Sequence, residues 1–417
     1  MRINTGKGTI SIMALIAIWS ISLTVNLPGL AITPMLGNLD SIFPRTSELE
    51  IQLLTVLPNL FIIPFVLLSG RLSLYKSKIR IVVIALVIYL ASGILYFFAG
   101  SMSDLIVISC LLGVGCGLLI PLAAGLLADT FAGRYRMRQL GIKSGISNIA
   151  LVVATYAVGW LSHGNWRMPF LVYLIPAVPL VLSVFLREIP KTDLDPAMSG
   201  TGVTAGTVSE AAAVSGRVKS GFILSRVWSL IAVYFFVCYS TVIVSYYTPF
   251  LMDADRMSDS DTGTVTAIFF LAVFLPGLVL PYIVKILRQT TFIVCSLVMA
   301  GGIILMAVSS GFGIMCAAAV MVGFGYGVFQ PLIYDKATQV VTDPGKCTLA
   351  LSFVLAANYI SISATPFIVG FFQDVFDPGH HDNAFPFELN AVLLAVFAVI
   401  VVIFRRSFVF RIDRSYY

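Results

Sequence analysis

Few residues of this chain carry a charge. Of its 417 residues 59% are hydrophobic and only 11% are charged, whereas a soluble domain carries roughly 25% charged residues. So few charges cannot cover a water-exposed surface of this size. The sequence therefore predicts that lipid is the main solvent of the chain.

Metal ligands and disulfide patterns are also scarce. The histidines lie in short polar connections, and the cysteines are scattered singly, without CxxC or other ligand spacing. We therefore expect no metal and no cofactor, and we interpret the cysteines as packing residues. The histidines are His163, His380 and His381, and the cysteines are Cys110, Cys116, Cys238, Cys295, Cys316 and Cys347.

Motifs for catalysis and for ATP binding are missing as well. The apolar segments contain no cluster of His, no Ser–Lys pair and no paired carboxylates at their centres. We therefore predict that the chain is not an enzyme. It carries no Walker A motif, which excludes ATP-driven pumping by this chain alone. A non-transporting membrane sensor stays a remote alternative, because transporter folds can be reused for signalling.

Long apolar segments are what the chain has in abundance. A bilayer requires about 20 apolar residues for one helical span, and twelve such segments can be placed. The first is too long for the apolar part of a signal peptide, so we expect it to be retained. The predicted spans are 10–32, 50–69, 79–99, 105–128, 140–161, 167–187, 226–250, 263–284, 290–309, 312–334, 348–372 and 388–405.

The longest polar interruption divides these spans into six and six. It opens with charged residues and prolines and continues through Ser, Thr, Gly and Ala, a composition typical of a flexible linker. We therefore predict an N-terminal six-helix half at 1–190, a cytoplasmic linker at 191–225 and a C-terminal six-helix half at 226–417.

The basic residues indicate the orientation of the chain. With both termini in the cytoplasm, 23 of the 26 Lys and Arg residues fall on the cytoplasmic side, as the positive-inside rule requires. The sequence therefore predicts a multi-pass protein of the inner or plasma membrane, embedded in the lipid bilayer. Because the net charge of +6 is explained by topology, we expect no nucleic-acid partner.

A glycine pattern occurs twice, about half a chain length apart. Each copy lies in a long apolar segment that ends in an aspartate, Asp129 or Asp335. Two glycines four residues apart on one helix face allow a neighbouring backbone to approach closely. Recurrence in equivalent spans predicts a duplicated bundle, and such bundles bind solutes between their halves. Gly113, Gly115, Gly117 and Pro121 recur as Gly323, Gly325, Gly327 and Pro331.

Local motifs, together with this organisation, resemble the major facilitator superfamily. The stretch Gly70–Arg80 after the second span keeps the first glycine and the basic character of that family's motif, although Leu74 and Tyr75 replace its Asp and Arg. Asp129-Thr-Phe131 is followed by Arg134 and Arg138, which is similar to the family's acidic-then-Arg signature at the inner gate. Trp166-Arg167-x-x-Phe170 also fits.

The resemblance covers essentially the whole chain and implies an all-α transmembrane fold. The expected fold is a twelve-helix bundle of two six-helix repeats, which works as a secondary transporter. The resemblance also implies gating or coupling roles near the inner ends of the helices. The residues expected there are Gly70, Asp129, Arg134, Arg138 and Asp335.

Polar residues near the centres of spans are the candidates for solute binding. A polar side chain in lipid is costly unless it is paired or faces a water-filled cavity. The alternative is that these residues join helices by hydrogen bonds. The candidates are Asn26, Asn59, Asn148, Tyr156, Tyr239, Ser240, Gln330, Tyr334, Asn358 and Tyr359.

The charges of the spans suggest the nature of the solute. The apolar spans carry carboxylates only at their ends, and we expect no acid or base near a span centre. A neutral, weakly charged or lipophilic small molecule is therefore expected. We predict proton-coupled efflux of amphipathic compounds by alternating access, from a protein acting as a monomer. Arg45 and Arg167, near the expected outer face, keep uptake of a nutrient or organic acid open as the alternative.

Overall fold

The computed structural model describes residues 2–28, 48–161, 165–188, 224–254, 259–308, 311–341, 344–376 and 383–412. The chain opens with an antiparallel hairpin that the sequence analysis did not predict, formed by β1 (Arg2–Asn4) and β2 (Thr9–Ser11). The remaining elements are helices, which is the expected result in lipid because a helix satisfies its own backbone hydrogen bonds.

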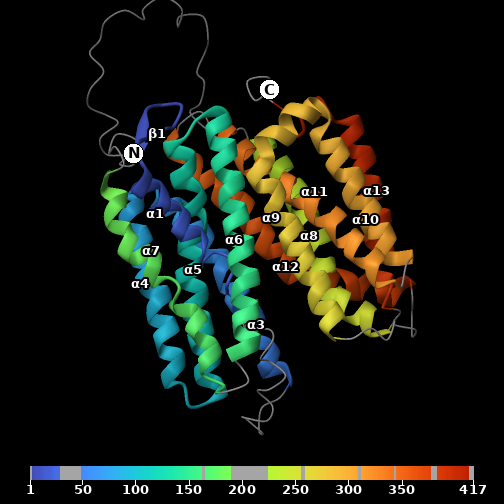
Figure 1. Ribbon diagram of the computed structural model, residues 1–417, viewed down its shortest axis with the longest axis horizontal. Helices are drawn as coiled ribbons and strands as arrows, with labels where there is room; N and C mark the ends of the chain where they lie inside the picture. Colours follow the sequence, from blue (N-terminus) through green and yellow to red (C-terminus); the bar gives the residue numbers. More distant parts are fainter. Residues whose placement is uncertain are drawn as a thin grey trace, which may run out of the picture.

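The first half of the chain forms one helical bundle, on the left in Figure 1. A capping box starts α5: Asp104 N donates to Ser101 Oγ, and Ser101 N donates to Asp104 Oδ2. The bundle consists of α1 (Ile12–Ser22), α3 (Glu48–Leu72), α4 (Lys78–Leu95), η2 (Tyr96–Phe98), α5 (Met102–Thr130), α6 (Gly133–Leu161), η3 (Met168–Leu174), α7 (Ala177–Leu182) and η4 (Ser183–Glu188).

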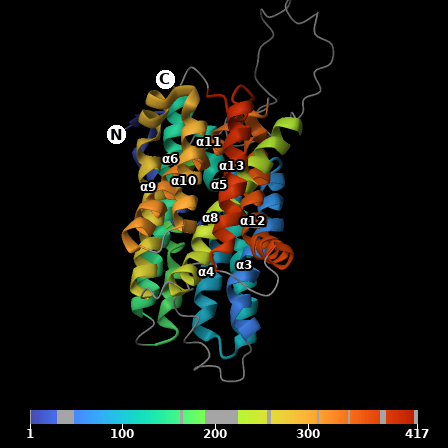
Figure 2. The same ribbon diagram turned by 90° about the vertical axis from the view of Figure 1, so that its right-hand side faces the viewer.

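The second half forms the other bundle, and in both bundles most of the long helices run side by side along one direction, whereas part of α12 lies across them (Figure 2). Each of the twelve predicted spans contains helical structure where the chain is described, although the first, 10–32, begins in β2 and is helical only over α1. The predicted linker 191–225 lies almost entirely outside the described residues. The elements are α8 (Leu224–Ala254), α9 (Asp259–Leu287), η6 (Arg288–Thr290), α10 (Thr291–Val308), α11 (Phe312–Gln339), η7 (Pro344–Lys346), α12 (Cys347–Phe376) and α13 (Phe385–Ile403).

The repeated glycines pack corresponding helices in the two bundles. A Cβ added at Gly113 would lie 2.6 Å from Pro58 O of α3, and one at Gly323 would lie 2.6 Å from Phe269 O of α9. Gly115 faces the opposite way and meets Tyr89 of α4, as Gly325 meets Met299 of α10. The repeat in the sequence is therefore also a repeat in packing, with α5 and α11 at the centres of their bundles.

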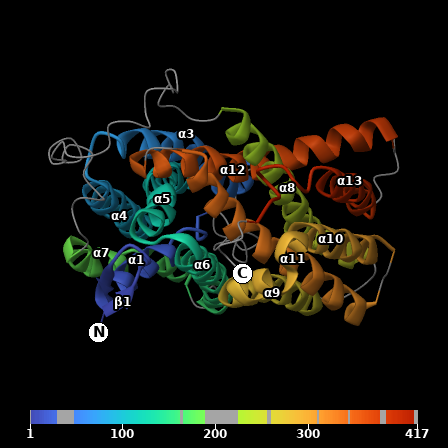
Figure 3. The same ribbon diagram turned by 90° about the horizontal axis from the view of Figure 1, so that it is seen from above.

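The two bundles meet along two helix pairs, α3 with α12 and α6 with α9 (Figure 3). On α6 and α9 this approach depends on glycine: a Cβ on Gly141 would collide with Gly277 O, and a Cβ on Gly277 would collide with Gly141 O. Gly145 likewise faces the ring of Phe274. These contacts leave a central space between the bundles, which contains the site described next.

Candidate substrate-binding cavity

A cavity lies between the two bundles and is lined by both. Its walls come from the segment after α1 and from α3, α5, α6, α8, α9, α11 and α12. Together with the space that leads to solvent, it measures about 890 Å³. The cavity itself has a volume of about 100 Å³. A larger solute therefore requires the walls to move apart.

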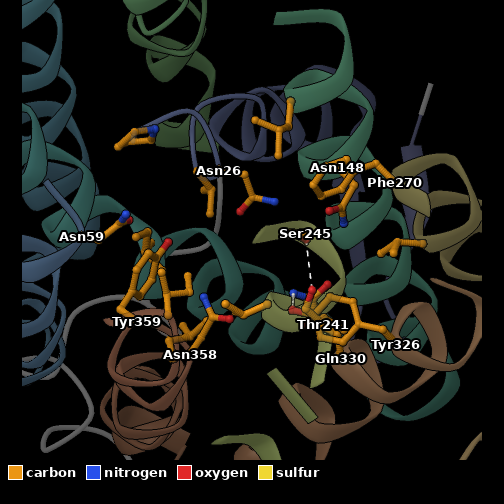
Figure 4. Close-up of a pocket in the computed structure, with 18 of the residues that line it drawn as sticks. Asn26, Asn59, Asn148, Thr241, Ser245, Phe270, Tyr326, Gln330, Asn358 and Tyr359 are labelled. Atoms are coloured by element: carbon orange, nitrogen blue, oxygen red, sulfur yellow. Dashed lines mark hydrogen bonds between the residues drawn. The ribbon is translucent and has the colours of Figure 1, made fainter. Parts of the chain in front are cut away.

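Seven of the ten residues predicted to bind solute line this cavity. Amide side chains approach it from opposite bundles, and apolar and aromatic surfaces such as Phe270 lie between them (Figure 4). This mixture suits an amphipathic molecule, since aromatic walls contribute buried area and the amides orient polar groups. The seven residues are Asn26, Asn59, Asn148, Gln330, Tyr334, Asn358 and Tyr359.

The other three predicted residues lie away from the cavity. Tyr156 projects from α6 with 79% of its surface exposed, because its position on the helix points outward from the bundle. Tyr239 is buried outside the lining. Ser240 donates to Asn390 Oδ1 of α13 at 3.1 Å and so joins two helices, which was the alternative role considered for such residues.

One charged residue in the lining contradicts the expectation that no acid or base lies near a span centre. Lys143 lines the cavity, and only 2% of its surface is exposed. It lies near the start of the span predicted at 140–161. The helix begins at Gly133 instead, which places Lys143 in its third turn. Ser144, Ser147 and Asn148 continue the polar stripe beside it, and that stripe was the signal available in the sequence.

A hydrogen-bonded network closes one end of the cavity. Gln330 Nε2 donates to the hydroxyls of Tyr326 at 3.1 Å, Tyr334 at 3.2 Å and Tyr234 at 3.3 Å. The hydroxyls of Tyr234 and Tyr334 are 2.7 Å apart. Ser144 of the other bundle donates to Gln330 Oε1. Gln330 therefore links α6 to α8 and α11 across the boundary between the bundles. We call this network the floor of the cavity.

Beyond this floor lies the side of the molecule that carries both ends of the described chain, which we call the terminal side (Figure 1). The hairpin contacts the turn between α5 and α6 there, through a hydrogen bond from Ala132 N to Thr5 O of 3.0 Å. Near the end of the described chain, Phe408 lies under Lys336 Nζ of α11, 5.0 Å from the ring centre. Both ends of the chain are on this side in Figure 1.

Predicted gating residues lie at the terminal side and contact the opposite bundle. Arg136 Nε donates to Asp335 Oδ1 at 2.6 Å, which joins α6 to α11. Gly70 of α3 faces Ser352 of α12. These contacts agree with a gate that is closed on this side of the cavity.

The two aspartates pair differently, one within a bundle and one between the bundles. Asp129 pairs with Lys78 Nζ at 2.5 Å inside the first bundle, and Asp335 pairs with Arg136. Arg134 and Arg138 are exposed on α6, because they occupy the helix face turned away from the second bundle. Arg136, which lies between them in the same basic stretch, contacts the opposite bundle through Asp335.

Comparison with protein families gives a match over most of the chain. The family described as Major Facilitator Superfamily matches residues 10–341 and again residues 232–411. Among curated proteins, the multidrug transporter protein MdtP of Bacillus subtilis is 27% identical over 184 residues, 44% of this chain and 32% of MdtP. The quinolone resistance protein NorA of Staphylococcus aureus (strain MRSA252) is 21% identical over 332 residues, covering 76% of this chain and 79% of NorA.

A third relative is a probable 4-methylmuconolactone transporter of Cupriavidus pinatubonensis. It is 33% identical over 125 residues, 29% of this chain and 28% of that protein. The matched segments thus span about a third of MdtP and less of this third relative.

Solved structures show the same fold at low sequence identity. The proton:xylose symporter XylE superposes with a TM-score of 0.72 and 12% identity, covering 94% of this chain and 95% of XylE. The human organic anion transporter MFSD10 gives a TM-score of 0.70 and 14% identity, covering 94% of this chain and 97% of MFSD10. At these identities the likeness concerns the fold alone.

Proposed function

The chain belongs to the major facilitator superfamily, and from this premise we propose that it moves a small amphipathic organic solute across the membrane by alternating access. The observation that carries the proposal is the cavity between the bundles, lined by amides, tyrosines and apolar side chains and closed at the terminal side. Alternating access requires such a site, with a gate that can open and close on each side.

Among the described residues, the salt bridge Arg136–Asp335 joins the bundles on the terminal side of the cavity. If the termini are cytoplasmic, as the distribution of Lys and Arg predicts, the cavity is shut toward the cytoplasm. Opening it there requires Arg136 to leave Asp335 and α6 to separate from α9.

For direction and energy source we propose efflux driven by protons. The relatives named for multidrug transport and quinolone resistance support export of amphipathic compounds. Asp335 is the carboxylate placed to lose its cationic partner when the gate opens, so it is the first candidate for proton coupling. Asp129 is the second candidate, although its partner Lys78 belongs to the same bundle. Uptake of an organic acid is the second candidate, and the cation in the cavity favours it.

Transport into proteoliposomes tests this function. Purified protein is reconstituted, a pH gradient is imposed, and movement of a fluorescent fluoroquinolone and of an aromatic acid is followed against protein-free vesicles. We expect accumulation of at least one probe and its loss when an ionophore collapses the gradient. Movement that survives the ionophore would remove proton coupling. If the protein moves none of the probes faster than protein-free vesicles do, with or without the gradient, the proposed function is contradicted.

A further inference from the structure

Lys143 is the charged residue of the cavity lining that the structure describes. The lining contains no Asp or Glu within the described residues, so the net charge of that wall is positive. The Lys143 side chain is almost fully buried from bulk solvent, at 2% exposure. Its ammonium nitrogen lies 5.3 Å from the centre of the Tyr334 ring. Its ammonium group therefore lies in the cavity wall next to the residues of the Gln330 network.

The ammonium of Lys143 differs from the other buried lysine in the same bundle. Lys78, 1% exposed, is matched by Asp129 at 2.5 Å. Among the described residues, the salt bridges join Lys78 to Asp129 and Arg136 to Asp335. In that part of the chain no carboxylate lies within salt-bridge distance of Lys143. A buried charge without a counter-charge is costly, and within a membrane such groups mark the paths of ions and substrates.

The contact with Tyr334 offsets only a small part of this cost. A cation over an aromatic face is stabilised, but far less than by an opposite charge at hydrogen-bond distance. The fold therefore maintains a cation that has no protein counter-charge in the described walls. An anionic group of a bound solute would supply it.

We propose that Lys143 binds the carboxylate of the solute, so that the transported class is amphipathic organic acids with one negative charge and an apolar or aromatic body. One ammonium matches one carboxylate, and lysine acts here as a compact point charge. Asn148, five residues further along α6, and Asn358 of α12 line the same cavity with amide side chains. Phe269, Phe270 and Leu355 form apolar walls for the body of the molecule.

This inference rests on the proposed transport function and holds for either direction of transport. It differs from a structural role for Lys143, in which the ammonium would serve only to pack against Tyr334. A structural lysine would affect stability without distinguishing ligand charge. A binding lysine makes the affinity depend on whether the ligand carries a carboxylate.

The experiment compares matched ligands on detergent-purified protein. The probes are benzoate, 4-phenylbutyrate and octanoate, each beside its neutral amide, together with 4-phenylbutylamine. Thermal shift and equilibrium binding are measured for the wild type, Lys143→Met, Lys143→Arg and Lys285→Met. Lys285 is the control because its side chain is exposed near the end of α9, away from the cavity.

We expect at least one carboxylate to bind the wild type about tenfold or more tightly than its amide, as for a hydrogen bond to a charged group. Lys143→Met should abolish this preference while the unliganded protein melts no lower than the wild type, since an uncompensated charge has been removed. Lys143→Arg should keep the preference in part, and Lys285→Met should keep it fully.

Three results would overturn the assignment. They are equal binding of carboxylates and amides, a preference that survives Lys143→Met, and the failure of every carboxylate to bind. Transport assays separate this inference from the function on which it rests. If amides or amines are transported and Lys143→Met has no effect, the assigned class is wrong and the transporter function stands. If carboxylates bind through Lys143 but never cross the membrane, the binding role of Lys143 stands and the transporter function is wrong.

Discussion

Arg136 on α6 and Asp335 on α11 form a salt bridge of 2.6 Å that joins the two bundles at the terminal side of the cavity. The carboxylate is 1% exposed and the guanidinium 16% exposed, so the pair is shielded from bulk water. Shielded pairs keep more of their attraction than surface pairs do, and they leave a buried charge when one partner is removed. A gate held this way can be tested by removing one charge.

Asp335→Asn should shift the protein away from the state closed on the terminal side. The native thiol of Cys347, 7% exposed at the start of α12, reports this opening. Loss of the pair should raise the rate of maleimide labelling at Cys347 about fivefold or more, within the usual range of coupling between two states. Peptide mass spectrometry measures the rate at that site. Asp104→Asn, an exposed carboxylate at the opposite end of α5, is the control, and equal rates in both variants would contradict the gate.

The Lys78–Asp129 pair should contribute to folding of the first bundle. Both side chains are nearly inaccessible, at 1% and 2%. Asp129→Asn should lower the free energy of unfolding by about 3–5 kcal/mol, because it leaves the Lys78 ammonium without its counter-charge. The double variant Lys78→Met/Asp129→Leu should come close to the wild type. Thermal unfolding of all variants in one detergent measures this, and an additive double variant would argue against coupling of the pair.

Gly141→Ala should interfere with closure at the terminal side. The added methyl group would collide with Gly277 O of α9, so α6 and α9 cannot approach as they do in this structure. We expect the variant to fold, to transport about fivefold or more slowly, and to label faster at Cys347. Gly370→Ala in α12 is the matched control, since nothing lies within 4 Å of the position of its Cβ. Transport by Gly141→Ala at the wild-type rate would show that this contact is dispensable.

Two tyrosines separate lining from non-lining positions. Tyr359→Phe removes a hydroxyl in the cavity and should weaken solute binding by about 1 kcal/mol, the usual contribution of one hydrogen bond. Tyr156→Phe removes a hydroxyl from a side chain that is 79% exposed outside the cavity and should leave binding unchanged. Dissociation constants for the best-bound probe provide the comparison. A larger effect at Tyr156 would indicate that the solute binds elsewhere.

The sequence alone determined the architecture. Apolar length, basic loops and the paired glycine rows are local properties, and lipid leaves a long apolar segment little choice but a helix. The glycines that faced Pro58 and Phe269 could be assigned a packing role before their partners were known, because close helix contact requires small residues. The amides of the cavity could also be named, since a polar side chain at mid-span needs a polar environment.

Only the tertiary structure decided which of these groups meet. Tyr156 and Tyr359 both lie within predicted spans, yet one points outward and the other into the cavity, because the rotation of a helix depends on its neighbours. Arg136 rather than Arg134 or Arg138 pairs with Asp335, because one face of α6 is turned toward α11. The place of Lys143 followed from the start of α6 at Gly133, ahead of its apolar stretch, and helix boundaries of this kind depend on tertiary contacts.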